Sequence, residues 1–300
     1  MDFASFCTRS RVLIVAGKGG VGKTTVTAAM AVAAARAGLS VLIVEVEGKS
    51  GLTAAFGLPE LDYEEIDLAP GIRARTLTAD EALVEYLGDH GMGRVSRRLA
   101  ASGALEVVSN AVPGMKDILL LGKLKQLEVA GAADLIVLDA PAAGHAVSFL
   151  MSPSGLLDAI RVGPVRKQAQ GVVEMLSDGD RCQVILVTLP EETPVNELID
   201  TAFALEDRVG VQLGAIVVNG CVSKPPTEPC DLDSVPEAQA LASAVEFASR
   251  RYQLQEEQLE RLTDRIALPQ LRLPFISSPA IDSADIGVLA SALIDEVAKQ

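Results

Sequence analysis

The chain is poor in aromatic residues: its 300 residues include seven Phe, three Tyr and no Trp. Hydrophobic residues nevertheless make up 49% of the chain, so a sizeable core is available. The side chains of that core must be mainly aliphatic. This length fits one large domain or two modest ones, and length alone does not decide between them.

Positive charge is also scarce. Asp and Glu number 40 against 26 Lys and Arg, which gives a formal net charge of −14. A general nucleic-acid-binding protein presents a basic face to phosphates, and electrostatic attachment to anionic lipid needs one as well. The composition therefore disfavours both kinds of partner.

Long apolar runs and paired-cysteine motifs are missing too. No uncharged apolar run reaches the length of about 18 residues that a transmembrane helix needs, so we expect no direct membrane insertion. Residues 1–10 are short and mixed, unlike a signal peptide. The four cysteines form no C-x-x-C pair and no zinc spacing, so we expect inert thiols and a cytoplasmic location. They are Cys7, Cys182, Cys221 and Cys230.

What the chain does have is a glycine-rich segment at residues 17–25, GKGGVGKTT. It matches the phosphate-binding pattern G-x-x-x-x-G-K-[ST], with an additional lysine at Lys18. Glycines let backbone N–H groups turn toward an anion, Lys23 can reach the β- and γ-phosphates, and the Thr24 hydroxyl can ligate Mg²⁺. We therefore expect ATP and Mg²⁺ as cofactors. The expected phosphate contacts are Gly17, Lys18, Gly19, Gly20, Val21, Gly22, Lys23, Thr24 and Thr25.

The residues on either side fit the same motif. Residues 11–16 form a short apolar run rich in β-branched side chains, which is typical of a buried parallel strand. Residues 26–37 are rich in alanine and are followed by Gly38, which predicts a helix with a C-terminal glycine. Residues 40–46 predict the next buried strand. Strand, glycine loop, helix and strand are the unit that the motif requires.

A dinucleotide-binding site is the alternative. The glycines of the segment also fit G-x-G-x-x-G, and Glu45 or Glu47 follows the second strand, where a ribose-binding acid would lie. A lone G-x-G-x-x-G is a weak signal. Dinucleotide binding gives no role to Lys18 and Lys23, whereas a triphosphate with Mg²⁺ does.

Further strand-like runs at residues 135–138, 184–189 and 215–219 alternate with helical stretches. This alternation predicts an α/β fold with a mostly parallel, doubly wound sheet of the P-loop NTPase type. The alternation stops between about residues 76 and 128, where a capping box at Thr78 and a Pro-Gly pair predict two helices. We interpret that segment as a helical insertion within a single domain of residues 1–300.

Two more helices are expected near the end of the chain. Residues from about 236 to 265 carry many Glu and Arg and predict a long, solvated helix. Residues 286–298 are amphipathic but acidic on the polar face, whereas a membrane-targeting helix would be basic there. The second helix is therefore expected to pack on the sheet.

A second part of the site is predicted where the run at 135–138 ends. Asp139 follows it directly, and in a phosphate-loop enzyme such an acid holds the hydration shell of Mg²⁺; a helix N-cap is the alternative. The predicted metal site is thus Thr24 with Asp139. Gly144 follows shortly after and can offer its N–H to a γ-phosphate and release it on hydrolysis, which would make a switch.

These segments resemble a known group of proteins. The lysine at Lys18 resembles the signature of the deviant Walker A (SIMIBI) ATPases, the class containing the MinD and ParA positioning proteins and nitrogenase iron protein. Within it, DAPAAGH at 139–145 resembles the second switch, D-T-A-P-T-G-H, of the ArsA-like arsenite-pump and tail-anchored-protein-targeting ATPases. Weaker resemblances lie at the Pro-Gly pair 113–114, at Asn219 and at Pro274.

The resemblance implies a Mg²⁺-dependent ATPase. Lys18 would cross a dimer interface, or fold back, and stabilise charge on the transferred phosphoryl group, while Lys23 would hold the phosphates. Asn219 and Pro274 would lie beside the adenine. Two subunits, either a homodimer or a heterodimer with a paralogue, would close on ATP and open after hydrolysis, and would act on a protein client.

The chain departs from the family at the first switch, which is usually D-P-A-H or D-P-A-S. Here the residues are Glu47-Gly48-Lys49-Ser50. We expect Glu47 to orient the attacking water, with Glu45 as the second choice and a ribose or interface contact as the alternative. The cysteine pattern does not suit arsenite, and the short insertion does not suit membrane helices. A nucleotide-sensing scaffold and a small-molecule kinase or ligase remain as alternative functions.

Overall fold

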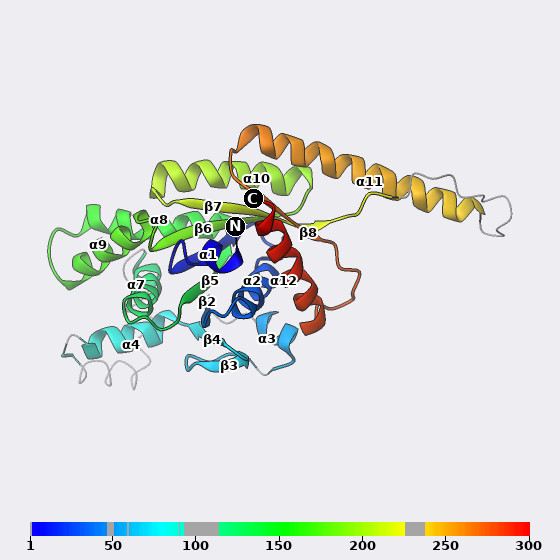
Figure 1. Ribbon diagram of the computed structural model, residues 1–300. Coiled ribbons are helices and arrows are strands. Elements are labelled where there is room, and N and C mark those ends of the chain that lie inside the picture. The colour runs from blue at the N-terminus through cyan, green and yellow to red at the C-terminus, as the bar shows by residue number, and fades with distance from the viewer. Residues whose placement is uncertain (1, 47–50, 59, 90, 93–113, 226–237) are drawn as a thin grey trace.

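The core of the molecule is one eight-stranded sheet, seen edge-on in Figure 1. This computed structural model describes residues 2–46, 51–58, 60–89, 91–92, 114–225 and 238–300. The strands are β1 (Val12–Gly17), β2 (Val41–Val46), β3 (Ile66–Ala69), β4 (Ile72–Leu77), β5 (Leu135–Ala142), β6 (Cys182–Thr188), β7 (Leu213–Cys221) and β8 (Gln270–Pro274). Their order is β3-β4-β2-β5-β1-β6-β7-β8, and only β3 and β4 pair antiparallel.

Helices cover both faces of this sheet (Figure 1). They are α1 (Phe3–Cys7), α2 (Lys23–Arg36), α3 (Gly51–Phe56), α4 (Ala79–Asp89), α7 (Met115–Val129), α8 (Ala143–Ala159), α9 (Pro164–Ser177), α10 (Glu192–Ala204), α11 (Ala238–Arg265) and α12 (Ser283–Ala298), with a π-helical turn η1 (Leu205–Val209). The face with α2 and α12 also carries α1, and the other face carries α7 to α11. The predicted α/β class with a mostly parallel sheet is confirmed.

The core is aliphatic, as the composition predicts. Along β1, Val12 and Ile14 join one buried cluster while Leu13 and Val15 join the other, because successive side chains of a strand point to opposite faces. Strands buried on both faces read as continuous hydrophobic runs, which is why five of them were recognisable in the sequence.

Three strands were not expected: β3, β4 and β8. β4 pairs in parallel with β2, so residues Thr76 and Leu77 belong to the sheet and the helical segment begins after them rather than at Thr76. The sequence hides β4 because its IRARTL run alternates apolar residues with Arg73 and Arg75. Arg75 is nonetheless buried, with its guanidinium over the ring of Tyr63.

The helical segment between β4 and β5 contains α4 and α7, which pack against each other. The predicted start of α4 is present: the Thr78 hydroxyl accepts a hydrogen bond from the Glu81 N–H, and it donates one to the Glu81 carboxylate. Gly114, with φ of 79°, precedes α7. Residues 93–113, including the first residue of the Pro-Gly pair, lie outside the described residues. That this segment forms an insertion in one domain stays a prediction.

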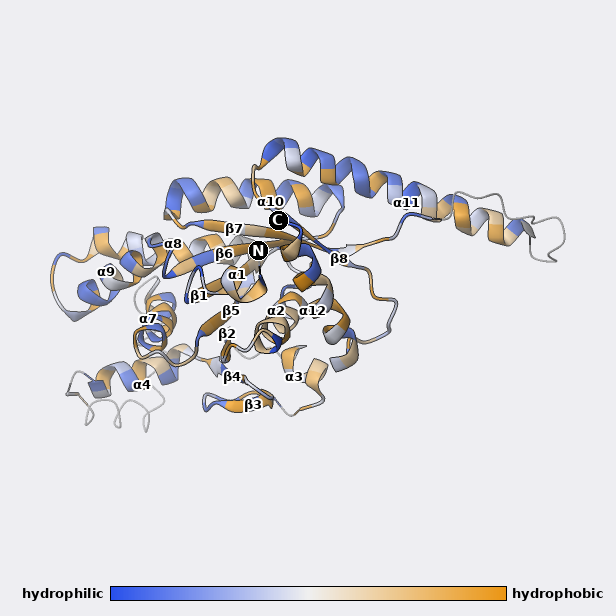
Figure 2. Cartoon of the chain, in the orientation of Figure 1, coloured by the Kyte–Doolittle hydropathy of each residue, from blue (hydrophilic) through white to orange (hydrophobic). Residues whose placement is uncertain are grey.

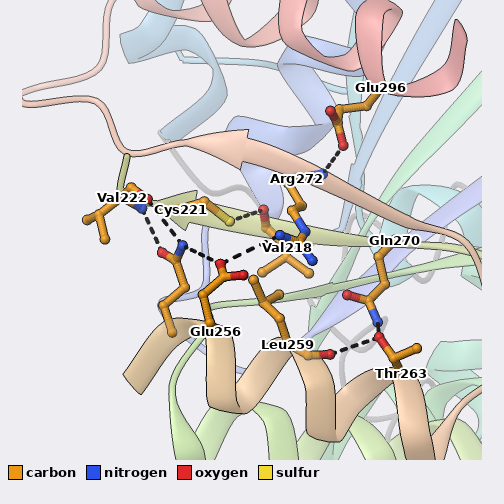
Figure 3. A network of polar contacts seen from close by, with 10 residues as sticks. Val218, Cys221, Val222, Glu256, Leu259, Thr263, Gln270, Arg272 and Glu296 are labelled. Carbon is orange, nitrogen blue, oxygen red and sulfur yellow. Dashed lines mark hydrogen bonds and ion pairs between the residues drawn. The ribbon is translucent and has the colours of Figure 1, made fainter. Parts of the chain in front are cut away.

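The predicted charged helix is α11, and only its second half is attached to the sheet. Gln255 accepts a hydrogen bond from the Val222 N–H and donates one to the Val222 carbonyl, and Glu256 pairs with Arg272 at 3.6 Å. Figure 3 shows Glu256 of the helix facing Arg272 of β8. The first half extends beyond the sheet in Figure 1, and in Figure 2 it mixes hydrophobic and hydrophilic colours, whereas the second half is mostly hydrophilic.

The C-terminal helix α12 packs on the sheet at β8, as predicted, and also packs against α2. Arg36 joins the two helices, because its guanidinium donates hydrogen bonds to the Gly287 carbonyl and to the Ser291 hydroxyl, both at 3.0 Å. Among the described residues, no helix combines the length and the apolar character that crossing a bilayer requires.

Candidate nucleotide-binding site

The glycine-rich segment lies at the carboxyl end of the central strand. β1 ends at Gly17, between β5 and β6, and α2 begins at Lys23. Ligands of open parallel sheets bind outside the carboxyl ends of the strands. The turn from residue 18 to residue 22 therefore occupies the edge where such a ligand is expected, with the positive end of α2 behind it.

The glycines of this turn are required for different reasons. Gly22 has φ of 90°, a conformation that L side chains rarely adopt, and a Cβ atom there would lie 2.3 Å from Nδ2 of Asn219. At Gly17 the obstacle is the backbone, because a Cβ atom would lie 2.3 Å from the carbonyl oxygen of Val187. Gly20 also has positive φ, 84°, but faces open space. The turn is thus a glycine cradle of the kind that phosphates occupy.

Lys23, the predicted phosphate ligand, and Thr24, the predicted metal ligand, both lie at the cradle. The Lys23 side chain is buried, and its ammonium donates a hydrogen bond to the carbonyl oxygen of Lys18 at 3.0 Å. The Thr24 hydroxyl donates to Oδ2 of Asp139 at 2.5 Å. Asp139 is itself buried on β5, directly beside Val15 of β1. The structure therefore brings together the hydroxyl and the carboxylate that the sequence predicts as metal ligands.

The predicted water-orienting residue Glu47 and residues 48–50 lie outside the described residues, so its role stays a prediction. The elements on both sides of it are described. Glu45, the second choice for orienting the water, is buried on β2 and lies opposite Asp139 of β5 in the strand register. After the gap, α3 begins at Gly51, where a Cβ atom would lie 3.5 Å from Cγ2 of Thr24. The start of α3 thus lies close to the metal-site threonine.

Lys18 lies at the same turn but is engaged elsewhere. Its ammonium forms an ion pair with Oε1 of Glu197 in α10 at 2.6 Å. Sequence reasoning missed Glu197. The two residues lie 179 positions apart and share no motif, so no local signal could have linked them.

The residues predicted beside the base lie at neighbouring strand ends. Asn219, near the end of β7, donates a hydrogen bond from Nδ2 to the Val21 carbonyl at 3.0 Å, so it supports the phosphate turn. Pro274 ends β8 next to Cys221. A cavity of about 390 Å³ opens beside them, and the guanidinium of Arg251 lies 4.9 Å from the ring centre of Phe275 on its wall.

Gly144 lies in the first turn of α8, directly after β5. The backbone N–H groups of a first helical turn have no partner within the helix. Gly144 therefore occupies a position from which its N–H can be offered to a ligand, as the switch prediction requires.

The cysteines are inert where the structure describes them. Burial raises the pKa of the Cys7 and Cys182 thiols to about 12 and that of Cys221 to about 11. The thiolate is the nucleophile and the metal ligand, so the raised pKa values disfavour both kinds of chemistry at neutral pH. In the described part of the chain, no three His, Cys, Asp or Glu side chains converge on a metal site. Cys230 lies outside the described residues.

A glycine cradle at the carboxyl edge of a parallel sheet, with a buried lysine and a threonine joined to an aspartate, defines a P-loop nucleotide-binding ATPase. The chain belongs to the anion-transporting ATPase family, whose family model matches residues 10–162. It is similar to ATPase BagA of Mycobacterium tuberculosis, at 32% identity over 93% of this chain and 90% of that protein. It is also similar to the arsenical pump-driving ATPase of Escherichia coli, at 26% identity over 69% of this chain and 39% of that protein. The dinucleotide alternative is thereby set aside.

Proposed function

We propose that this ATPase binds ATP with Mg²⁺, hydrolyses it while two subunits are closed, and passes its nucleotide state to a protein client. The observation that carries the proposal is the hydrogen bond from Thr24 to Asp139 beside the buried ammonium of Lys23. A hydroxyl and a carboxylate oxygen are ligands that Mg²⁺ prefers, and an ammonium inside a glycine cradle suits phosphate.

The chain's own residues have distinct roles in this proposal. Lys23 exchanges the carbonyl of Lys18 for phosphate oxygens, and the Gly17–Gly22 turn supplies backbone N–H donors. Thr24 and Asp139 hold Mg²⁺ and its hydration shell. Bound Mg²⁺ would neutralise charge on the β- and γ-phosphates. Glu47 orients the water.

The base is proposed to lie at the cavity beside β7 and β8. Its wall offers the faces of Phe275 and Arg251, which suit a flat aromatic ring. Asn219 is shared between the base side and the phosphate turn, because its amide supports the Val21 carbonyl. Binding the base and ordering the turn would therefore be linked.

Two subunits are proposed because of Lys18, with a second copy or a paralogue as the partner. The Lys18 side chain is paired with Glu197 of α10 and does not lie in the cradle of its own subunit. About a third of this side chain is exposed, so it is accessible from outside the subunit. A lysine delivered to the other subunit's triphosphate would act as an arginine finger does.

The route to a client is proposed to run through α8. This helix starts at Ala143 and carries Gly144, the proposed γ-phosphate contact, in its first turn, and it packs against α7 and α9. A shift of the first turn of α8 on hydrolysis would displace α7 and, through it, α4. The client would be a protein that contacts this helical segment.

The direct test is Lys23→Ala. Titration with a fluorescent ATP analogue and Mg²⁺ should show binding to the unaltered chain and none to the variant. Lys123→Ala is the matched control, because Lys123 of α7 is a partly buried lysine paired with Glu85 of α4, and its loss should leave binding unchanged. Unchanged binding in Lys23→Ala would overturn the proposal.

Phosphate release followed across protein concentration tests the dimer. Unaided phosphate-loop enzymes can turn over at only about 10⁻⁴ to 10⁻² s⁻¹, so the assay must resolve single turnovers. A rate per subunit that rises with concentration is expected. A constant rate would remove the dimer from the proposal, and bound ATP without release would favour the nucleotide-sensing scaffold.

A further inference from the structure

The ion pair between Lys18 and Glu197 joins the phosphate turn to a helix that is not part of the cradle. Glu197 lies in α10, where its neighbours Leu198 and Ile199 are buried against the sheet. The Thr201 hydroxyl donates to the Glu197 carbonyl at 2.6 Å. The carboxylate is therefore carried by a fixed element, while Lys18 is carried by a glycine turn.

The pairing is specific among the acids of this helix. α10 also carries exposed acids before and after Glu197, at Glu192 and Asp200. Of these, Glu197 is the one whose carboxylate reaches the Lys18 ammonium, at 2.6 Å. Both side chains remain partly exposed, at 36% for Lys18 and 43% for Glu197. Ion pairs of this kind are weak, so a competing anion can break this one.

We propose that Glu197 is a positioning residue for Lys18: it holds the ammonium on α10 until a triphosphate competes for it. This inference rests on the proposed function. A single carboxylate holds the lysine in this structure, whereas the γ-phosphate of ATP offers more negative charge and several acceptor oxygens. ADP lacks that group. The pair would thus make engagement of Lys18 depend on the nucleotide's third phosphate.

The test compares Glu197→Gln with Asp200→Asn, which removes the same charge one turn further along α10. Each is titrated with a non-hydrolysable ATP analogue and with ADP, in the presence of Mg²⁺. Because exposed ion pairs are weak, Glu197→Gln should tighten binding of the ATP analogue by up to about fivefold and that of ADP by less. Glu197→Asp, which keeps the carboxylate, should lie closer to the unaltered chain.

The decisive arm repeats Glu197→Gln in a Lys18→Ala background. If Glu197 acts through Lys18, the substitution has no effect there. If instead Glu197→Gln acts only by making the local field less negative, it should tighten binding of the ATP analogue and of ADP alike. Asp200→Asn should then have the same effect, and the effect of Glu197→Gln should persist without Lys18. That result, or no effect of Glu197→Gln at all, would overturn the inference.

The two proposals fail in different ways. An unaltered chain that binds neither nucleotide refutes the proposed function and this inference with it. An unaltered chain that binds the ATP analogue, with Glu197→Gln indistinguishable from it, refutes only the role of Glu197. Circular dichroism of each variant separates these outcomes from misfolding.

Discussion

The helices α2 and α11 flank the same sheet but are attached to it in opposite ways. α2 has 14 residues, of which nine are buried, and it is enclosed between the sheet and α12. α11 has 28 residues, and its buried side chains, Gln255, Leu259 and Leu262, all lie in the second half. Residues 239–248 of its first half are exposed throughout.

The difference follows the chemistry at each place. The first turn of α2 carries Lys23 and Thr24, so this helix must hold the phosphate cradle in one geometry, and burial on all sides does so. α11 contributes no residue to the phosphate cradle, and its residues line instead the cavity proposed for the base. Its first half exposes Leu241, Val245 and Phe247, the last at 69%. The helix that fixes the geometry of the phosphate cradle is thus the one that is packed on several sides.

The largest expected effect comes from the attached half of α11. Leu262 is fully buried in the core, so Leu262→Ala should lower the free energy of unfolding by about 2–5 kcal/mol. Phe247→Ala, on the exposed half, should change it by no more than about 0.5 kcal/mol. Urea denaturation followed by circular dichroism measures both. Equal losses would mean that the two halves do not differ in attachment.

A smaller effect separates two glycines before α2. Gly22→Ala and Gly20→Ala both place alanine at positive φ, but only the first also pushes a Cβ atom against Asn219. Without nucleotide, Gly22→Ala should be the less stable of the two by about 1–3 kcal/mol, the usual range for overpacking. The same unfolding assay gives the difference. A stability of Gly22→Ala equal to that of Gly20→Ala would show that Asn219 yields without cost.

The smallest effect concerns the hydrogen bonds that attach α11 to the end of β7. Gln255→Ala removes both hydrogen bonds to the Val222 backbone and should cost about 1–2 kcal/mol, because partly buried backbone groups lose their partners. Gln258→Ala is the control: the side-chain Oε1 of Gln258 accepts a hydrogen bond from Arg261 on the same helix, and losing it should cost less. Thermal unfolding of the two variants compares them. A larger loss for Gln258→Ala would contradict the role given to Gln255.

Sequence patterns predicted the strands that are continuous apolar runs and missed those that are not. β1, β2, β5, β6 and β7 were recognisable because both of their faces are buried. β4 carries Arg73 and Arg75 in alternation, and its partners are available only once β2 is in place. Strand identity there depends on pairing, which no short window of sequence contains.

The cradle itself was decided locally. Positive φ at Gly20 and Gly22 is a property of adjacent residues, so the letters GKGGVGKTT were enough to predict a glycine loop followed by a helix. The helix starts at Lys23, three residues before the predicted start at residue 26. Family membership follows from the same letters together with the segment after β5. The phosphate-loop pattern also predicted that Thr24 and Asp139 meet, although 115 positions separate them. What only the tertiary structure decided is the partner of Lys18, which is Glu197, 179 positions away. Such contacts depend on the order of strands in the sheet, because that order sets which carboxyl ends are neighbours.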